Sequence, residues 1–193
     1  MNRGINRAEK LKDNSCSLFE SYVRNDDEKG TCVFVSYRSA DREQAVAIAR
    51  YIKDSGIDVY IDVSDEGLQI ATVEDNPQSV VNYIHNGLLQ STHILVLISD
   101  DTKESWWVPY EIGYGENAGK IISSMMLTDS EVESFPDYLK VFRRLFSVTD
   151  FLDYIRGLKN LRSRYGGMFE DTHPYELPDE RLISGYIKEV GHD

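Results

Sequence analysis

Cysteine is scarce in this chain of 193 residues, and its two copies stand in different surroundings. Cys16 lies in a polar stretch near the N-terminus, whereas Cys32 opens an apolar run. Because structural disulfides are rare in reducing compartments, we expect two free thiols, with Cys32 packed in the core. The four histidines are scattered without the spacing of metal ligands, so no metal site is expected.

Long hydrophobic runs are also lacking. The most apolar stretch, Ile94 to Ile98, is far too short to span a bilayer, and the N-terminus has no apolar stretch of the kind that a secretory signal needs. We therefore expect a cytoplasmic protein. Basic residues are outnumbered, 21 against 33 acidic ones, and the formal net charge of −12 argues against nucleic acid or a membrane surface as partner.

From residue 31 onward the hydrophobic pattern alternates between strand-like and helix-like segments. Apolar runs predict strands at 32–36, 59–63, 94–98 and 120–127, and a fifth at 142–148. Helical spacing predicts helices at 41–54, 80–89, 106–118, 150–160 and 178–190. Such alternation requires right-handed crossovers and a mainly parallel sheet. We predict a flavodoxin-like three-layer α/β fold with about five central strands, in the common order 2-1-3-4-5.

The same pattern divides the chain into three parts. Residues 1–30 have enough apolar spacing for one amphipathic helix and form an N-terminal helical extension. Residues 31–150 form the α/β domain. Residues 151–193 are rich in tyrosine and charge and form a C-terminal helical extension.

Topology alone predicts where a ligand would bind. An open parallel sheet binds ligands beyond the carboxyl ends of its strands, where the order of winding reverses. In this chain that point lies between the first and third strands, and the loop 64–78 after the second strand can cover it. The candidate ligand contacts are the side chains at these two strand ends: Tyr37, Arg38, Ser39, Ser99 and Asp100.

The helix after the third strand begins at the same edge of the sheet and carries a glutamate, Glu111. Helical spacing puts it on one face with Trp107, Tyr114 and Ala118. Proximity to the helix N-terminus would help to keep the carboxylate ionised. Alternatively, Glu111 is a solvent-facing residue that only stabilises the start of its helix.

Two segments resemble the Toll/interleukin-1 receptor (TIR) domain family. Segment 33–42, VFVSYRSADR, looks like the opening motif of TIR domains, an apolar strand followed by Ser-Tyr and a polar turn. Segment 105–112, SWWVPYEI, is similar to the Ser-x-Trp-x-x-x-Glu segment that holds the catalytic glutamate of NAD-cleaving TIR domains. The resemblance covers about 31–150.

The stretch from IHNGLL (84–89) through segment 107–112 further resembles the bacterial branch, especially TIR proteins of Thoeris anti-phage systems, which make a cyclic ADP-ribose-type messenger from NAD. One departure concerns the loop after the second strand. Many eukaryotic TIR domains have a Pro-Gly pair there, whereas this loop has Gly67 and no proline until Pro77. Adaptor-style pairing through that loop is therefore not expected.

The resemblance implies an NAD nucleosidase or ADP-ribosyl cyclase with Glu111 as the catalytic residue. NAD would be the substrate, and no cofactor is expected. Arg38 could pair with the pyrophosphate, or it could be a surface arginine paired with Asp41 or Asp100. Tyr37 could stack on a base, Trp107 could wall the nicotinamide pocket or belong to the core, and Ser99 and Asp100 could contact ribose or phosphate.

Partners follow from the same resemblance. It implies self-association and an effector protein that is reached through a diffusible nucleotide product. Two other functions stay open on the sequence: a non-catalytic TIR scaffold that signals by self-association, and an enzyme similar to nucleoside deoxyribosyltransferases. The identity of the product, the trigger and the oligomeric state also stay open.

Overall fold

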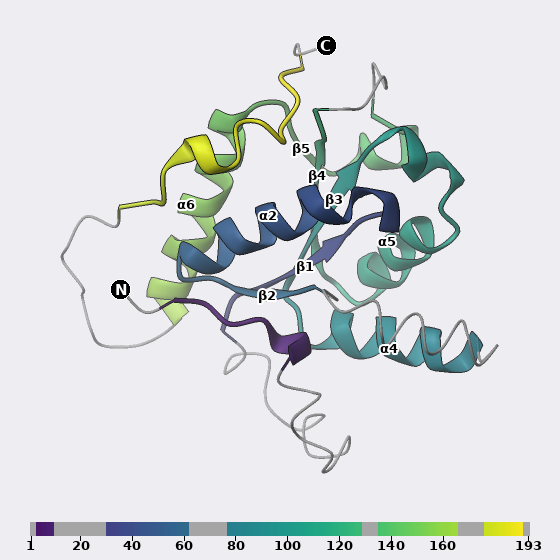
Figure 1. Cartoon of the computed structure of the whole chain (residues 1–193). Coiled ribbons are helices and arrows are strands. Elements are labelled where there is room, and N and C mark those ends of the chain that lie inside the picture. The colour runs from purple at the N-terminus through teal and green to yellow at the C-terminus, as the bar shows by residue number, and fades with distance from the viewer. Residues whose placement is uncertain (1–2, 10–29, 62–76, 129–134, 166–175, 191–193) are drawn as a thin grey trace.

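The computed structural model describes residues 3–9, 30–61, 77–128, 135–165 and 176–190 (Figure 1). At its centre lies a parallel sheet of five strands in the order β2-β1-β3-β4-β5, which confirms the predicted topology. The second and fifth strands are shorter than predicted. The loop expected to cover the crevice lies outside the described residues as far as position 76. The strands are β1 (Cys32–Ser36), β2 (Asp58–Tyr60), β3 (His93–Ile98), β4 (Ile121–Met126) and β5 (Arg143–Leu145).

Helices cover both faces of this sheet, as the three-layer prediction requires (Figure 1). α2 (Arg42–Asp54) and α6 (Val148–Tyr165) lie on one face, and α4 (Pro77–Leu89) and α5 (Trp107–Asn117) lie on the other. These bounds agree with four of the predicted helices to within a few residues. Short 3-10 turns complete the described structure: η3 (Ser39–Asp41), η4 (Asp100–Glu104), η5 (Asp137–Leu139) and η6 (Glu180–Leu182).

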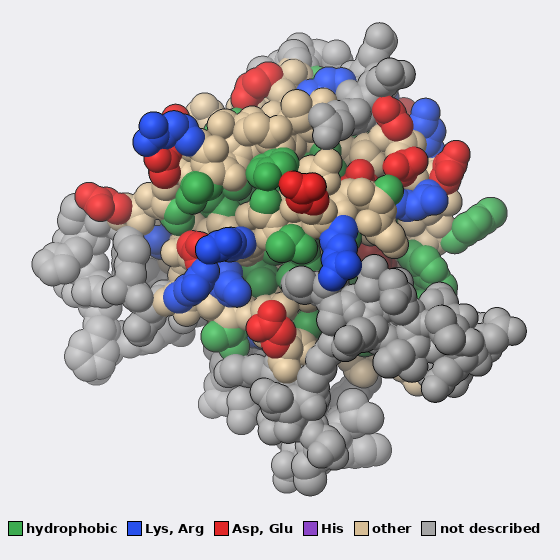
Figure 2. Space-filling model, viewed as in Figure 1, with side chains coloured by type: hydrophobic (Ala, Val, Ile, Leu, Met, Phe, Trp, Pro, Cys, Tyr) green, Lys and Arg blue, Asp and Glu red, His purple; other side chains and the backbone are tan. Residues whose placement is uncertain are grey.

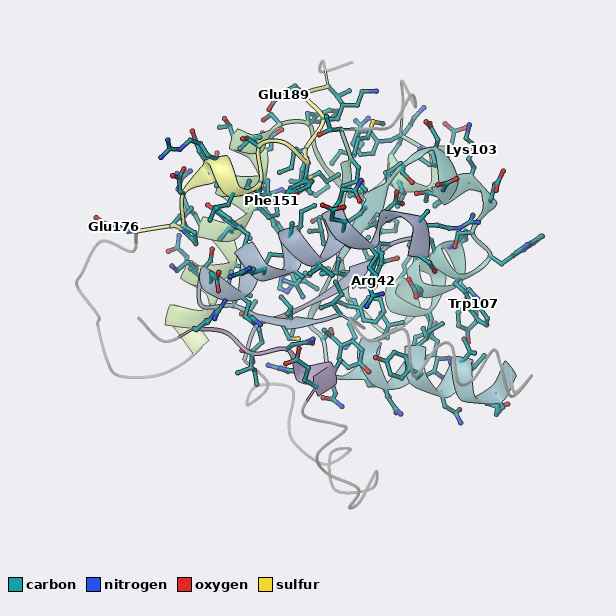
Figure 3. All side chains as sticks on the ribbon, viewed as in Figure 1. Arg42, Lys103, Trp107, Phe151, Glu176 and Glu189 are labelled. Atoms are coloured by element: carbon teal, nitrogen blue, oxygen red, sulfur yellow. The ribbon has the colours of Figure 1, made fainter. Side chains whose placement is uncertain are left out.

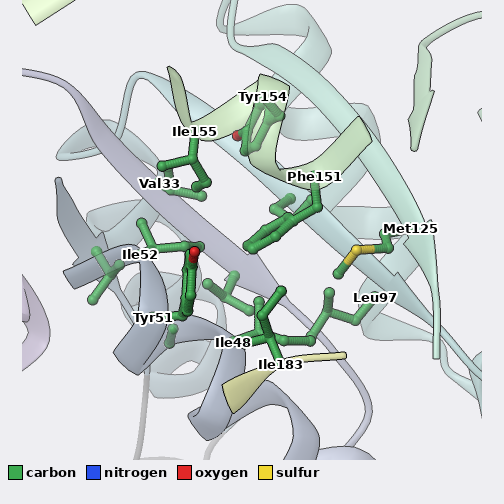
Figure 4. Packing of buried hydrophobic residues seen from close by; sticks show 14 of the residues in the cluster. Val33, Ile48, Tyr51, Ile52, Leu97, Met125, Phe151, Tyr154, Ile155 and Ile183 are labelled. Carbon is green, nitrogen blue, oxygen red and sulfur yellow. The ribbon is translucent and has the colours of Figure 1, made fainter. Parts of the chain in front are cut away.

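The central strand β3 is buried throughout and sends alternate side chains into two separate cores. Leu95 and Leu97 pack under α2 and α6, where they join Phe151 and Met125 (Figure 4). The other core lies under α4 and α5. There α5 comes so close to the sheet that a Cβ on Gly115 would lie 2.1 Å from Ile94 Cδ1, so only glycine fits without a movement of the Ile94 side chain.

The described N-terminal residues, 3–9, extend the sheet at its β2 edge. Asn6 forms a parallel bridge with Val59, and the Arg7 guanidinium donates to Asp58 Oδ2 at 2.9 Å and to the carbonyl of Gln90 at 2.7 Å. An edge strand with unpaired backbone groups invites association, and this segment covers that edge. Most of the amphipathic helix predicted within residues 1–30 lies outside the described residues.

The predicted helix at 178–190 is wrong. After η6 the chain makes turns over 183–186 and then runs along the carboxyl end of the sheet, where Leu127 and Ile187 form an antiparallel bridge. Lys188 N donates to Met126 O at 3.0 Å, and Val190 N donates to Phe146 O at 2.8 Å. Ile183 and Ile187 have helical spacing, but the free carbonyls at the strand ends compete for the backbone amides of this segment.

Both flanking segments therefore pack against the same cores as the strands. The division into 1–30, 31–150 and 151–193 stays a prediction. Figure 2 shows acidic and basic side chains interspersed over one face of the molecule. Across the described ranges, each helix is too short or too polar to cross a membrane.

Candidate active site

Glu111 faces the sheet. The buried positions of α5 are Val108, Glu111, Ile112 and Gly115, and only 9% of Glu111 is exposed. The solvent-facing alternative is thus excluded. The predicted face needs a correction, since Ala118 is exposed and Trp107 is 36% exposed. The helix is turned so that Val108 and Ile112 take the apolar contacts, which leaves Glu111 at the border of the buried stripe.

Ser36 is the hydrogen-bond partner of this carboxylate. Its Oγ donates to Glu111 Oε2 at 2.6 Å, and both side chains are buried. Ser36 is the last residue of β1, and its side chain shares a face with Cys32 and Phe34, toward α4 and α5. The sequence analysis used Ser36 only to mark a strand end. The two-residue period of β1 was the signal that could have placed its side chain on this face.

Burial dominates the electrostatics of Glu111. It raises the pKa of the carboxyl from 4.5 to about 8, while the hydrogen bond from Ser36 works in the opposite direction. Burial thus works against ionisation of this carboxyl, and the help expected from the helix N-terminus stays a prediction. Among the described residues no cation acts on Glu111, so its carboxyl would respond to a positive charge brought by a ligand.

A second buried serine and carboxylate lie at the same edge of the sheet. Ser99 Oγ donates to Asp41 Oδ2 at 2.5 Å, which ties the end of β3 to the start of α2. Thr102 Oγ1 accepts from Ser99 N at 2.9 Å and fixes the turn η4. Burial raises the pKa of Asp41, and Ser99 and Arg38 counteract that rise. The sequence analysis did not single out Asp41 as a ligand contact.

Arg38 spans the two strand ends. Its Nη1 donates to the carbonyl of Asp101 at 2.8 Å and lies 3.9 Å from Glu104 Oε2. The guanidinium is thus partly exposed and held at the rim, between the loops that follow β1 and β3. Ser39 is exposed and Asp100 is partly buried at the same rim, where they begin η3 and η4.

Tyr37 follows Ser36 but lies on the other side of the sheet. It is partly buried and packs against the core under α2 and α6, whereas Ser36 and Glu111 lie toward α4 and α5. The structure thus brings Ser36 and Glu111 together and joins Arg38 to the β3 end, but it does not place Tyr37 beside the carboxylate. Stacking of Tyr37 on a base stays a prediction.

Trp107 belongs to an aromatic group between α5 and α4, on the outer side of α5 (Figure 3). It contacts Tyr110 edge to face, with ring centroids 6.0 Å apart. Tyr110 Oη lies 2.7 Å from His85 Nε2, and the His85 ring stacks on Tyr114 at 4.0 Å. Sequence reasoning missed His85 and Tyr110 because their meeting depends on how two helices pack. A role for Trp107 in a nicotinamide pocket stays a prediction.

Fold and site together define an open parallel α/β domain with a buried acid at the point where the winding order reverses. A protein-family model described as TIR domain matches residues 33–154, which is more than half of the chain. The chain therefore belongs to the TIR domain family, and the resemblance seen in the sequence is confirmed. This assignment favours the TIR hypotheses over an enzyme of the deoxyribosyltransferase type.

Two individual proteins were also found to be similar. Over 98 residues the chain is 24% identical to the "probable 3' cyclic ADP-D-ribose synthase ThsB'" of Bacillus cereus (strain MSX-D12). That match covers 50% of this chain and 49% of the relative, so the chain spans about half the length of that protein. The TIR domain of the Toll-related receptor TRR-2 from Hydra magnipapillata matches at a TM-score of 0.46 and 14% identity, over 70% of this chain and 98% of that one.

Proposed function

We propose that this chain is a bacterial TIR-domain enzyme that cleaves the nicotinamide–ribose bond of NAD and makes a cyclic ADP-ribose-type signal in Thoeris-like anti-phage defence. Membership of the TIR family and the partial similarity to a probable cyclic ADP-ribose synthase support this proposal. The observation that carries it is the carboxylate of Glu111, which is buried at the carboxyl edge of the sheet and held by Ser36.

The chemistry suits a single carboxylate. Nicotinamide leaves as a neutral molecule, so its departure needs little help from an acid. Positive charge develops instead on the ribosyl group that stays behind. Glu111 would balance the positive charge that develops on the ribose and accept hydrogen bonds from its hydroxyls. In a site with little water such a contact is worth roughly a hundredfold or more in rate.

The substrate itself would set the ionisation state of Glu111. The pyridinium ring of NAD carries a positive charge, and a nearby opposite charge favours the ionised form of a carboxyl. Bound NAD would thus lower the pKa of Glu111 from its raised value of about 8. The same interaction that binds the ring would prepare the carboxylate for the ribosyl cation.

The product depends on what attacks the ribose carbon after nicotinamide leaves. Attack by water gives ADP-ribose and one proton, whereas attack by the adenine of the same molecule closes a ring. Arg38 at the rim would pair with the pyrophosphate, with Ser39, Ser99 and Asp100 as contacts to ribose or phosphate. Tyr37 and Trp107 remain the candidate contacts for the two bases, and the cyclic product would reach an effector protein by diffusion.

The test is chromatography of the products from NAD incubated with wild type, Glu111→Ala and Glu116→Ala. Glu116 is the matched control because it lies exposed on the same helix. We expect nicotinamide and an ADP-ribose product from wild type and Glu116→Ala, and a loss of at least about a hundredfold in Glu111→Ala. Absence of nicotinamide from the wild type, also at high protein concentration and with cell extract as activator, would contradict the proposal.

A non-catalytic scaffold is the second candidate function. Three aromatic side chains are exposed near the start of α5, namely Trp106 at 91%, Trp107 at 36% and Tyr110 at 37%, and they could contact a second copy of the chain. Under this reading Glu111→Ala would retain full biological activity.

A further inference from the structure

We propose that Ser36 is a positioning residue that holds the Glu111 carboxylate in its working orientation. This inference deepens the proposed function and rests on it. The observation is the buried contact of 2.6 Å between Ser36 Oγ and Glu111 Oε2, which joins the end of β1 to α5. The two residues are far apart in the sequence and meet because α5 packs closely on the sheet.

The position of α5 on the sheet determines which residue of β1 lies beside Glu111. Gly115 lies against the Ile94 side chain of β3, whose Cδ1 occupies the place that a Cβ would take. Four residues before it, about 6 Å along the helix axis, comes Glu111. Two residues further along β3, about 6.6 Å, comes Val96, which is paired in register with Ser36. The close approach at Gly115 therefore brings Glu111 level with the last residue of β1.

The contact fixes one carboxylate oxygen and leaves the other for a ligand. Ser36 donates to Oε2, whereas no donor among the described residues reaches Oε1. A carboxylate held at one oxygen cannot rotate freely, so the direction of Oε1 is set before a substrate arrives. Prior orientation of this kind lowers the cost of reorganisation during a reaction.

Ser124 is a matched control because it lies at the same level of the sheet as Ser36, on a neighbouring strand of β3. Val96 pairs with Ser36 on one side and with Ser124 of β4 on the other. Ser124 is fully buried and shares the face of Ile122 and Met126, toward α4 and α5. In the described part of the chain its Oγ has no hydrogen-bond partner. Replacing this serine removes the same atom from the same layer without touching Glu111.

The experiment compares wild type, Ser36→Ala, Ser36→Thr and Ser124→Ala. The first measurement is the titration of the Glu111 side-chain carboxyl by carbon-13 NMR, without substrate. The second is kcat and KM for nicotinamide release from NAD across the pH range in which all four proteins stay folded by circular dichroism. Ser36→Thr keeps the hydroxyl and serves as the conservative rescue.

We expect Ser36→Ala to raise the midpoint of the Glu111 titration by roughly one pH unit or more, because a charge-assisted hydrogen bond is lost. The acidic limb of the kcat/KM profile, which reports the free enzyme, should move upward by the same amount, with about a tenfold loss at pH 7 that recovers at high pH. Ser36→Thr should restore both midpoints, and Ser124→Ala should leave both unchanged.

An unchanged Glu111 midpoint in Ser36→Ala, or an equal shift in Ser124→Ala, would overturn the role of Ser36. If Ser36→Ala does not fold, the same comparison in Ser36→Cys decides, since cysteine is only a weak donor and should also raise the midpoint. Failure of the wild type to release nicotinamide would contradict the proposed function alone, because the NMR comparison tests Ser36 without any turnover.

Discussion

Two serine–carboxylate pairs lie at the carboxyl edge of the sheet, and they differ in what surrounds the acid. Asp41 accepts from Ser99 at the start of α2, where the charges of Arg38 and of neighbouring acidic side chains already act on it. Glu111 accepts from Ser36 in an apolar setting, and burial raises its pKa to about 8. The comparison teaches that Glu111, which has no cation beside it in the described part of the chain, is the acid prepared to balance a new positive charge.

The largest effect expected from this comparison is on how the free energy of unfolding depends on pH. The pKa of Glu111 is about 8 in the fold against 4.5 for the free group, so the folded protein holds more protons between these values. Stability from this group is therefore full below pH 4.5 and is lost as the pH rises toward 8. Glu111→Gln should remove that loss and exceed the wild type in unfolding free energy by a few kcal/mol at pH 8.5.

Urea unfolding at several pH values checks this prediction, with Glu116→Gln as the control on the exposed side of α5. Equal pH dependence of wild type and Glu111→Gln would mean that Glu111 is hydrated in solution, and the contrast between the two acids would disappear.

Removal of the other buried charge should matter less. Asp41→Asn keeps a hydrogen-bond acceptor for Ser99 and removes a charge whose burial Ser99 and Arg38 offset in part. We expect its unfolding free energy at pH 8.5 to change by about 1 kcal/mol or less. A gain as large as that of Glu111→Gln in the same urea experiment would show that the two acids are equivalent.

The third expected effect is on substrate binding at the rim. If Arg38 pairs with the pyrophosphate, Arg38→Ala should raise KM for NAD about tenfold with little change in kcat, since it removes a charge-assisted contact that is equal in ground and transition states. Arg50→Ala, an exposed position near the end of α2, is the control. An unchanged KM in steady-state kinetics would mean that Arg38 does not bind the substrate and only connects Asp101 to the loop that follows β1.

Sequence periodicity was sufficient for much of the fold and for one residue of the site. β1 and β3 are continuous apolar runs, and a strand buried on both faces requires such runs, so both strands and their order could be predicted. Glu111 stood out through its motif and its place after the central strand. Local patterns of this kind depend only on neighbours in the chain.

Contacts between distant segments could not be predicted in the same way. The Ser36–Glu111 bond depends on the approach of α5 at Gly115, and the Ser99–Asp41 bond depends on how two loops meet. The helix predicted at 178–190 was wrong for a related reason. Ile183 and Ile187 have helical spacing, but backbone carbonyls at the strand ends accept hydrogen bonds from this segment. A local sequence pattern cannot predict such distant partners.

The central claim is tested most directly by nicotinamide release from NAD by wild type and Glu111→Gln, measured at one pH at which both are folded. Glutamine keeps the shape of the side chain and one acceptor oxygen for Ser36, but it replaces the other oxygen by an amide donor and removes the charge. The account predicts a loss of at least about a hundredfold. Equal rates in the two proteins would contradict it, because the reaction would then not depend on the charge of this buried carboxylate.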